Sequence, residues 1–544
     1  MKPDAVVIGA GPNGLVAANL LADEGWDVLV LEANEVPGGA VRTAEVTAPG
    51  FRNDLFSAFY PLAAASPVLS ALDLEAHGLR WVHAPLVLAH PLRDGRAAVL
   101  ARDLDVTAAG LDGFSPGDGD RWRDLFGTWE RAGGALLGAL TSPMPPVRAG
   151  ARLARAIGTR DLLPFARFGL LPVRRMGEEW FRGEGGPLLL AGNALHTDLP
   201  PEAPGGGLFG WVLAMLGQQV GFPVPEGGAQ RLTDALVARL GAGGGRVECG
   251  TRVVGVRIEG GRATGVRTEA GDDIDAGRAV LADCDVITLY RRLVGPEHLP
   301  ARVLADLERF QPGAATVKVD WALSAPIPWT NPDARRAGTL HLADSLDELS
   351  ITSAQLAAGL VPDRPFLLFG QMTTADPTRS PAGTEAAWAY THVPQVVKGD
   401  AGEGGIKGTW DDTDTARFVE RLEARVEAFA PGFGERIIAR HVFTPPTLQA
   451  ANANLVGGDV LGGTSGLHQQ LVFRPTPGFG RPETPVRGLY LASASAHPGG
   501  GVHGACGANA ARAALAHDRL PRRLAVVAGA AAAGALAVVR ARVR

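Results

Sequence analysis

Short apolar runs alternate with a helical pattern at the start of the chain. Residues 5–8 (Ala-Val-Val-Ile) are apolar and mostly β-branched, which is typical of a buried parallel strand. A glycine-rich turn follows, then a helical pattern over Leu15–Asp23, and Asp27–Leu31 predicts a second strand that ends at Glu32. The pattern therefore predicts a strand–helix–strand unit, with Gly25 placed to end the helix.

A second group of elements is predicted in the middle of the chain. Apolar residues at helical spacing predict a helix over Gln230–Leu240, and Arg246–Cys249 predicts a strand after it. Val253–Ile258 and Ala263–Arg267 predict a β-hairpin that turns at Gly260-Gly261.

The composition is that of a globular chain. Of its 544 residues, 46% are hydrophobic and 20% are charged, which excludes wholesale disorder. A net charge of −5 provides no global basic field for nucleic acid. Cys249, Cys284 and Cys506 are too few and too scattered for a disulfide scaffold, a C-x-x-C redox pair or a cysteine zinc site. We therefore expect an intracellular, cytoplasmic setting, with no metal and no nucleic-acid partner.

The turn after the first strand has the spacing of a dinucleotide site. Gly9, Gly11 and Gly14 form G-x-G-x-x-G, which allows a tight turn, close approach to a pyrophosphate, and close helix–strand packing. The helix N-terminus offers free N–H groups to phosphates. Glu32 is placed to accept hydrogen bonds from the adenosine ribose. Because strand, turn, helix, strand and acid occur together, we expect an adenine dinucleotide here.

The loop Gly38-Gly39-Ala40-Val41-Arg42 follows Glu32, and the family resemblance that it helps to carry implies FAD rather than NAD. Asp4–Arg42 resembles the N-terminal signature of phytoene desaturases, flavin amine oxidases and their relatives, in which such a loop lines the FAD. The pattern is closest to the branch that contains the mammalian pyridine nucleotide-disulfide oxidoreductase domain-containing protein 2. The resemblance implies an α/β protein with a Rossmann-like FAD-binding domain of glutathione-reductase-like topology. The FAD-binding residues that it implies are Gly9, Ala10, Gly11, Pro12, Asn13, Gly14, Glu32, Ala33, Gly38, Gly39, Ala40, Val41, Arg42, Val253, Ser493, Gly500, Gly501, Val502 and His503.

A C-terminal segment extends the resemblance. Gly488–Ala492 predicts a strand and Ala505–Leu515 a helix, with a Pro-Gly-Gly-Gly loop between them. This arrangement resembles the C-terminal motif of carotenoid desaturase-like flavoproteins, in which the helix N-terminus would stabilise negative charge on the reduced flavin. Gly499, Gly501 and Gly504 also satisfy G-x-G-x-x-G, but no acid-bearing strand–helix–strand unit accompanies them. We therefore expect one dinucleotide site.

The other segments are expected to form a discontinuous α+β substrate domain. Thr316–Leu323 and Glu385–His392 predict strands, and the resemblance implies an antiparallel sheet above the flavin with a helical cap. The predicted boundaries are 1–75, 229–290 and 441–520 for the FAD-binding domain, 76–228 and 291–440 for the substrate domain, and 521–544 for an arginine-flanked apolar tail.

Two segments bear on membrane contact. Residues 146–176 hold seven arginines against the single acid Asp161, interleaved with leucine and phenylalanine. Such a stretch fits either a peripheral membrane contact or a cap helix with a solvated face. Residues 524–539 are uncharged but too short to span a bilayer, since a helix rises only about 1.5 Å per residue. We expect this tail to be interfacial or loosely packed.

Lys318 is the catalytic candidate. Gly313–Lys318, followed by Trp329, resembles the amine oxidase strand that presents a lysine through water to flavin N5. Such a lysine would assist flavin reoxidation by O₂; the alternative is a structural lysine at the edge of the substrate sheet. Weaker candidates, for which structural hydrogen bonding is the ordinary role, are His196, His468, His497 and His503.

Three functions stay open. The leading one is an FAD-dependent oxidoreductase that acts on a long apolar isoprenoid such as a carotenoid, by dehydrogenation, oxygenation or isomerisation. Hydride would pass to flavin N5 and the electrons to O₂ or a quinone. The alternatives are a flavin amine oxidase that uses Lys318 and a flavin-bearing interaction protein with little turnover. An NAD(P)H-driven disulfide reductase is disfavoured, because the sequence lacks the cysteine pair and a second dinucleotide fold.

Overall fold

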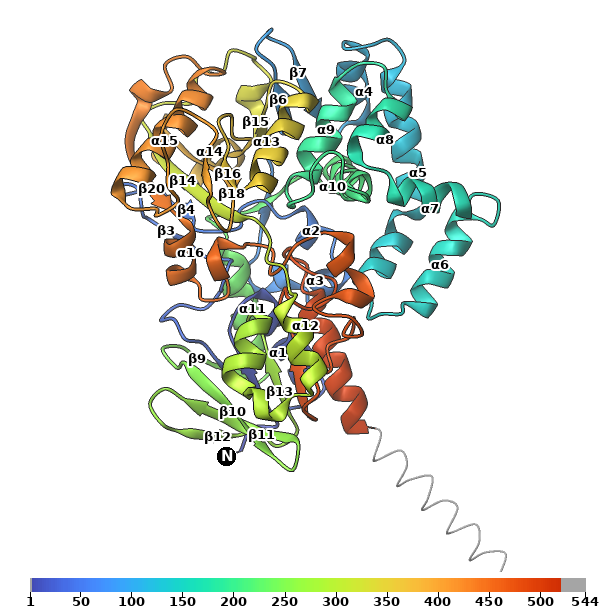
Figure 1. Cartoon of the computed structure of the whole chain (residues 1–544), viewed down its shortest axis with the longest axis vertical. Helices are drawn as coiled ribbons and strands as arrows, with labels where there is room; N and C mark the ends of the chain where they lie inside the picture. Colours follow the sequence, from blue (N-terminus) through green and yellow to red (C-terminus); the bar gives the residue numbers. More distant parts are fainter. Residues whose placement is uncertain (1, 520–544) are drawn as a thin grey trace, which may run out of the picture.

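A five-stranded parallel sheet forms the centre of the lower lobe in Figure 1. The predicted strand–helix–strand unit is present as β1 (Ala5–Ile8), α1 (Pro12–Ala22) and β2 (Val28–Leu31). The structure, a computed structural model, describes residues 2–519. In spatial order the strands are β21 (Leu489–Leu491), β13 (Ala279–Ala282), β1, β2 and β9 (Arg246–Glu248).

Both faces of this sheet are covered, as is usual for parallel strands. Val7 and Val30 pack on one face against α1, α11 (Gln230–Ala242) and the helix at 505–519. Ile8 and Leu31 pack on the other face, under a three-stranded antiparallel sheet. The predicted hairpin and central helix are thus confirmed. The three covering strands are β10 (Val253–Glu259), β11 (Arg262–Thr268) and β12 (Asp273–Asp275).

A seven-stranded sheet forms the upper lobe (Figure 1). Its pairings are antiparallel, as expected, except that β15 runs parallel to β6, a strand from an earlier segment of the chain. In spatial order the strands are β20 (Ile437–Phe443), β14 (Ala315–Leu323), β18 (Glu385–Val393), β17 (Leu367–Gln371), β15 (Ala337–Leu342), β6 (Leu86–Pro91) and β7 (Ala97–Leu100).

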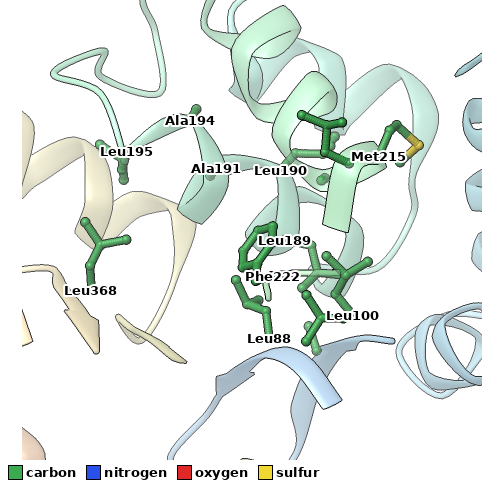
Figure 2. Packing of buried hydrophobic residues seen from close by; sticks show 14 of the residues in the cluster. Leu88, Leu100, Leu189, Leu190, Ala191, Ala194, Leu195, Met215, Phe222 and Leu368 are labelled. Carbon is green, nitrogen blue, oxygen red and sulfur yellow. The ribbon is translucent and has the colours of Figure 1, made fainter. Parts of the chain in front are cut away.

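Helices cap one side of this sheet. Figure 2 shows Leu189, Leu190 and Met215 of two cap helices packed around Leu88 and Leu100 of the sheet. The cap helices are α4 (Leu104–Asp112), α5 (Asp118–Thr141), α6 (Val147–Ile157), α7 (Leu162–Leu170), α8 (Val173–Trp180), α9 (Gly185–Ala194) and α10 (Gly206–Val220). The other face of the sheet packs against α15 (Asp412–Glu427).

Shorter elements connect the lobes and cover their edges. They are β3 (Thr43–Ala44), β4 (Asn53–Asp54), α2 (Pro61–Ala64), α3 (Pro67–Ser70), β5 (Trp81–Val82), β8 (Val224–Pro225), α12 (Ala301–Glu308), α13 (Leu346–Ala358), β16 (Leu360–Val361), α14 (Met372–Ala375), β19 (Gly399–Asp400) and α16 (Pro445–Ala451).

The upper lobe is discontinuous in sequence, as predicted. Strands from 76–228 and from 291–440 share its sheet. The predicted boundary at residue 440 falls inside β20, because the pairing of β20 with β14 continues to Phe443, opposite Lys318. Within residues 2–519, no helix has the length and apolar character needed to cross a membrane. The tail at 524–539 lies outside the described residues.

Candidate active site

The glycine-rich turn between β1 and α1 is held by the carboxylate of Glu32. Its Oε2 accepts the N–H of Ala10 at 2.8 Å, and its Oε1 accepts the N–H of Asn34 at 2.9 Å. Glu32 is 5% exposed. A carboxylate has about four lone-pair positions, so Glu32 retains capacity for a further hydroxyl donor.

The turn has the shape that a dinucleotide requires. A Cβ on Gly14 would lie 2.2 Å from the carbonyl oxygen of Gly9, so α1 packs directly on the turn only because glycine is present. Gly39 approaches as closely: a Cβ there would lie 3.0 Å from Cα of Gly11. Asn13 Oδ1 is buried at the start of α1 without a hydrogen-bond partner among the described residues. These features fit a polar ligand at this helix N-terminus.

Asp283 lies beneath the same turn and was not among the predicted site residues. Its Oδ2 accepts the N–H of Gly14 at 2.8 Å, although the two residues are 269 positions apart. Burial raises the pKa of Asp283 to about 7, and the charge of Glu32 adds to this increase. Asp283 follows β13 directly, so its position at the end of a short apolar run, Ala279–Ala282, was the available signal.

The C-terminal loop meets the same helix N-terminus. A Cβ on Gly504 would lie 2.9 Å from Val16 of α1, and one on Gly507 would overlap the carbonyl of Asn13. His503 Nδ1 accepts the N–H of Ala505 at 3.0 Å and so caps the helix that follows. Burial lowers the pKa of His503 to about 4, which leaves this histidine neutral at pH 7.

The structure brings the predicted residues together in three groups. In addition to these groups, the 250–253 segment contacts Glu32, because the N–H of Thr251 donates to the carbonyl oxygen of Glu32 at 2.8 Å. The first group is Gly9, Ala10, Gly11, Pro12, Asn13 and Gly14 in the turn and the start of α1, with Glu32 and Ala33 beside it. The second is the adjoining loop Gly38, Gly39, Ala40, Val41 and Arg42, and the third is Ser493, Gly500, Gly501, Val502 and His503 after β21. Val253, at the start of β10, lies two residues beyond Thr251.

Lys318 lies on the face of β14 that is turned toward the cap. Its Nζ is 2.5 Å from both carboxylate oxygens of Asp320. Asp320 was not among the site residues predicted from the sequence. The two side chains are 4% and 0% exposed. Burial raises the pKa of Asp320 to about 6, against the opposing pull of Lys318. Residues two apart on a strand share a face, so Lys-Val-Asp in the predicted strand was the signal.

Two aromatic rings extend this face. Trp388 lies with its ring centre 5.9 Å from Lys318 Nζ, and it stacks on Tyr390 with ring centres 5.9 Å apart. Tyr390 is opposite Lys318 in the pairing of β14 with β18. The rings and the ion pair therefore form one continuous surface on the inner side of the sheet.

Three histidines lie where the cap meets the sheet. The Nε2 atoms of His196 and His341 are 2.9 Å apart, a hydrogen bond between two neutral rings. Burial lowers the pKa of His196 to about 3, with a further contribution from nearby His392, and holds that of His341 well below its usual range. The other candidates bond elsewhere: His468 Nε2 contacts Gln311 and His497 Nε2 contacts the carbonyl of Ser142.

A second buried ion pair joins the two lobes. Arg379 Nη2 lies 2.7 Å from Asp54 Oδ1, and both side chains are fully buried. Asp54 also accepts hydrogen bonds from the hydroxyl of Thr43 and the N–H of Ala229. This carboxylate therefore connects the upper sheet to the segments around the dinucleotide turn.

Arg379→Met should lower the free energy of unfolding by about 3 kcal/mol, because it leaves the buried Asp54 charge without its cation. Denaturant unfolding of the apoprotein measures this loss. The double variant Arg379→Met/Asp54→Asn should recover part of it, since the uncompensated charge is then gone. Equal stability of Arg379→Met and wild type would show that the pair does not stabilise the fold.

Comparison with known proteins identifies the family. Residues 13–353 match the family model described as flavin containing amine oxidoreductase. The chain belongs to this family. It is therefore an FAD-dependent oxidoreductase of the amine oxidase and phytoene desaturase superfamily.

Relatives cover nearly the whole chain. The pyridine nucleotide-disulfide oxidoreductase domain-containing protein 2 of Rattus norvegicus is 29% identical over 94% of this chain and 93% of its own length. A limonene dehydrogenase component of Castellaniella defragrans is 24% identical over 94% of both chains. Phytoene desaturase (neurosporene-forming) of Cereibacter sphaeroides is also 24% identical over 94% of both. The resemblance to the first of these branches is thus confirmed.

Among solved structures, cyclohexylamine oxidase from Brevibacterium oxydans matches with a TM-score of 0.58 at 17% identity. The match covers 95% of this chain and 100% of that one. At this identity the likeness establishes the shared fold, an FAD-binding domain joined to a substrate domain.

Proposed function

We propose that this flavoprotein dehydrogenates a long apolar isoprenoid, such as a carotenoid. The observation that carries the proposal is the inner face of the upper sheet, where the charged groups Lys318 and Asp320 neutralise each other. The relatives named for phytoene desaturation and limonene dehydrogenation support this class of substrate. Oxygenation and isomerisation of the same substrate class are variants of the proposal.

We also propose that the three groups of residues at the N-terminus of α1 hold FAD. The N–H groups of the turn and the start of α1 would face the pyrophosphate, and Glu32 would accept the ribose hydroxyls. The Gly38–Arg42 loop and the 493–503 loop would line the rest of the cofactor. When bound, FAD supplies the hydride acceptor at N5.

The inner sheet face suits a substrate without charge. A buried charge that lacks a partner is costly, so a site for a charged substrate must offer an uncompensated opposite charge. Here Lys318 and Asp320 are already paired, and the His196–His341 pair is neutral at pH 7. Trp388 and Tyr390 add apolar ring surface. These groups can orient an apolar chain and exclude water without contributing an acid or base.

The second candidate, a flavin amine oxidase, is favoured by one arrangement. The Trp388 and Tyr390 rings lie beside Lys318, so an amine nitrogen placed there would face aromatic surface. A protonated amine would, however, meet a lysine whose neighbouring carboxylate, Asp320, is already engaged. Because Lys318 and Asp320 are already paired with each other, we favour an apolar substrate over an amine.

Flavin bleaching tests the proposal directly. The FAD-loaded full chain would be mixed anaerobically with liposomes that carry phytoene or later carotenoid intermediates, and in parallel with primary amines. Bleaching by a polyene is the expected result. Bleaching by amines alone would assign the second function. If the bound flavin stays intact and unbleached with polyenes and with amines, both enzymatic functions would be overturned. That result would favour an interaction protein.

Lys318→Met should leave reduction by the substrate unchanged but slow reoxidation of the reduced holoprotein by O₂ about tenfold, equivalent to about 1.4 kcal/mol. The reason is that Lys318 Nζ has three N–H donors and uses two of them on Asp320, so the third can still donate to the oxygen on which negative charge develops. Stopped-flow absorbance after photoreduction measures both rates. The matched control is Lys398→Met, since Lys398 is exposed. Equal reoxidation of the two variants would exclude this role for Lys318.

A further inference from the structure

We propose that α6, α7 and the turn at 471–473 form one surface that binds an anionic lipid bilayer; we call it the lipid-facing surface. This proposal goes beyond the proposed function because it identifies the lipid bilayer as the place from which an apolar substrate would reach the protein. Only the delivery of substrate from the bilayer rests on the proposed function. The surface itself is defined by its exposed apolar side chains and its exposed arginines.

Helix α7 presents apolar side chains to solvent. None of its residues is buried, and Leu163 and Leu170 are 80% and 60% exposed. These two leucines are seven positions apart, so they lie on the same face of the helix. The opposite side holds the helix in place, because Phe165 and Phe168 pack edge-on against Trp211 of α10. The exposed leucines are therefore displayed by an anchored helix.

Helix α6 runs beside α7 at the edge of the molecule (Figure 1) and carries a basic stripe. Arg148, Arg152 and Arg155 are exposed and spaced i, i+4 and i+7, which places them on one face. Within residues 2–519 none of them forms an ion pair, whereas Arg167 and Arg175 are both paired with Glu179. The stripe is thus a set of uncompensated cations next to exposed leucines.

The turn at 471–473 adds a second apolar patch. Leu471, Val472 and Phe473 are 40%, 41% and 45% exposed. Leu471 has a φ of 57°, a left-handed conformation that side chains seldom adopt and that the surroundings must hold. Three successive large apolar residues kept at the surface in a strained turn mark a contact site rather than a core element.

Backbone contacts place this turn next to the two helices. The N–H of Gly205 donates to the carbonyl of Leu170 at 3.1 Å, and a Cβ on Gly205 would lie 3.2 Å from Leu467. At the start of α6, the N–H of Met144 donates to Gly480 at 2.9 Å. A Cβ on Gly480 would lie 2.9 Å from the carbonyl oxygen of Leu471. The turn therefore adjoins the end of α7 and the approach to α6.

The chemistry of the surface fits lipid rather than a folded partner. Leucine and phenylalanine enter the boundary between headgroups and acyl chains, and arginine pairs bidentately with phosphate.

The turn at 471–473 continues into Arg474, whose side chain donates to the carbonyls of Leu461, Gly462 and Ala494. Ala494 belongs to the 493–503 loop. A substrate dissolved in the bilayer would thus meet the protein beside loops of the proposed FAD site.

Vesicle sedimentation of the full-length holoprotein tests the surface. Wild type should bind vesicles of phosphatidylcholine with phosphatidylglycerol, and more weakly at high salt. Arg148→Gln/Arg152→Gln/Arg155→Gln should lower the partition coefficient about a hundredfold, as expected for three arginines at an anionic surface. Leu163→Ser/Leu170→Ser/Phe473→Ser should lower binding to these vesicles and to pure phosphatidylcholine alike. All substituted side chains are exposed, and thermal melts verify folding.

The matched control removes three other arginines. Arg121→Gln/Arg292→Gln/Arg417→Gln changes the net charge equally at exposed sites on other elements, and should bind as wild type does. Equal binding by the first arginine variant, or no binding by wild type, would overturn the proposal. The proposal would also be overturned if, without vesicles, wild type formed a dimer and the Leu163→Ser/Leu170→Ser/Phe473→Ser variant did not. A second copy of the chain would then cover this face. Flavin reduction by detergent-dispersed polyene tests the proposed function separately.

Discussion

Replacing Gly14 with alanine should abolish stable FAD binding. The added Cβ would lie 2.2 Å from the carbonyl oxygen of Gly9 and 3.2 Å from Asp283 Oδ2, so α1 must move away from the turn. That movement displaces the N–H groups that we expect to face the pyrophosphate. The dissociation constant should rise at least about a thousandfold, a loss of about 4 kcal/mol. Flavin retained after gel filtration, and quenching of flavin fluorescence on titration, measure the change.

The control for this substitution is Gly134→Ala on α5, where an added Cβ meets nothing within 4 Å. It should bind FAD normally and be slightly more stable, because alanine favours helix. Circular dichroism establishes that Gly14→Ala is folded as the apoprotein. A folded Gly14→Ala that binds FAD as tightly as wild type would refute the proposed location of the pyrophosphate.

Asp283→Asn should stabilise the apoprotein above neutral pH by up to about 4 kcal/mol. The pKa of Asp283 in the folded protein, about 7, lies above its unfolded value, because the carboxyl is buried and faces Glu32. Its contribution to stability is therefore present in full below about pH 4 and is lost as pH rises through 7. Asparagine keeps an acceptor for the N–H of Gly14 without a charge.

Thermal melts between pH 5 and pH 8.5 measure this effect. The difference in melting temperature between Asp283→Asn and wild type should be small at pH 5 and should grow up to pH 8.5. The groups that face Asp283 are Glu32 and the thiols of Cys284 and Cys506, none of them cationic. Asp124→Asn, at an exposed position on α5, should show no such pH dependence. A difference that stays constant with pH would mean that Asp283 does not titrate in this range.

The local structure of the proposed FAD site was largely predictable, because its first part is built from short contiguous motifs. The first strand, the turn, α1 and Glu32 interact within a few residues or across one strand pairing. Glycine is required at such a turn by local sterics, so its spacing is visible without knowledge of the fold. The hairpin of β10 and β11 was predictable for the same reason, since two glycines set its turn.

Lys318 and Asp320 show where the pattern was informative but insufficient. Alternation in β14 places both on one face, yet it does not say whether that face meets solvent or the cap. Charged residues usually face solvent, so a buried Lys–Asp pair is not the expected interpretation of such a strand. The packing of the cap against the sheet decided the question.

Local patterns along the chain predicted a glycine-rich turn with the spacing of a dinucleotide site, an acid at the end of β2, a glycine loop and the family to which the chain belongs. Only the tertiary structure placed Asp283 under Gly14, joined Arg379 to Asp54, and left the leucines of α7 at the surface beside the arginines of α6. The physical reason is one of range. Turns, strand alternation and helix periodicity follow from neighbouring residues, whereas burial and ion pairing depend on which distant surfaces the chain packs together.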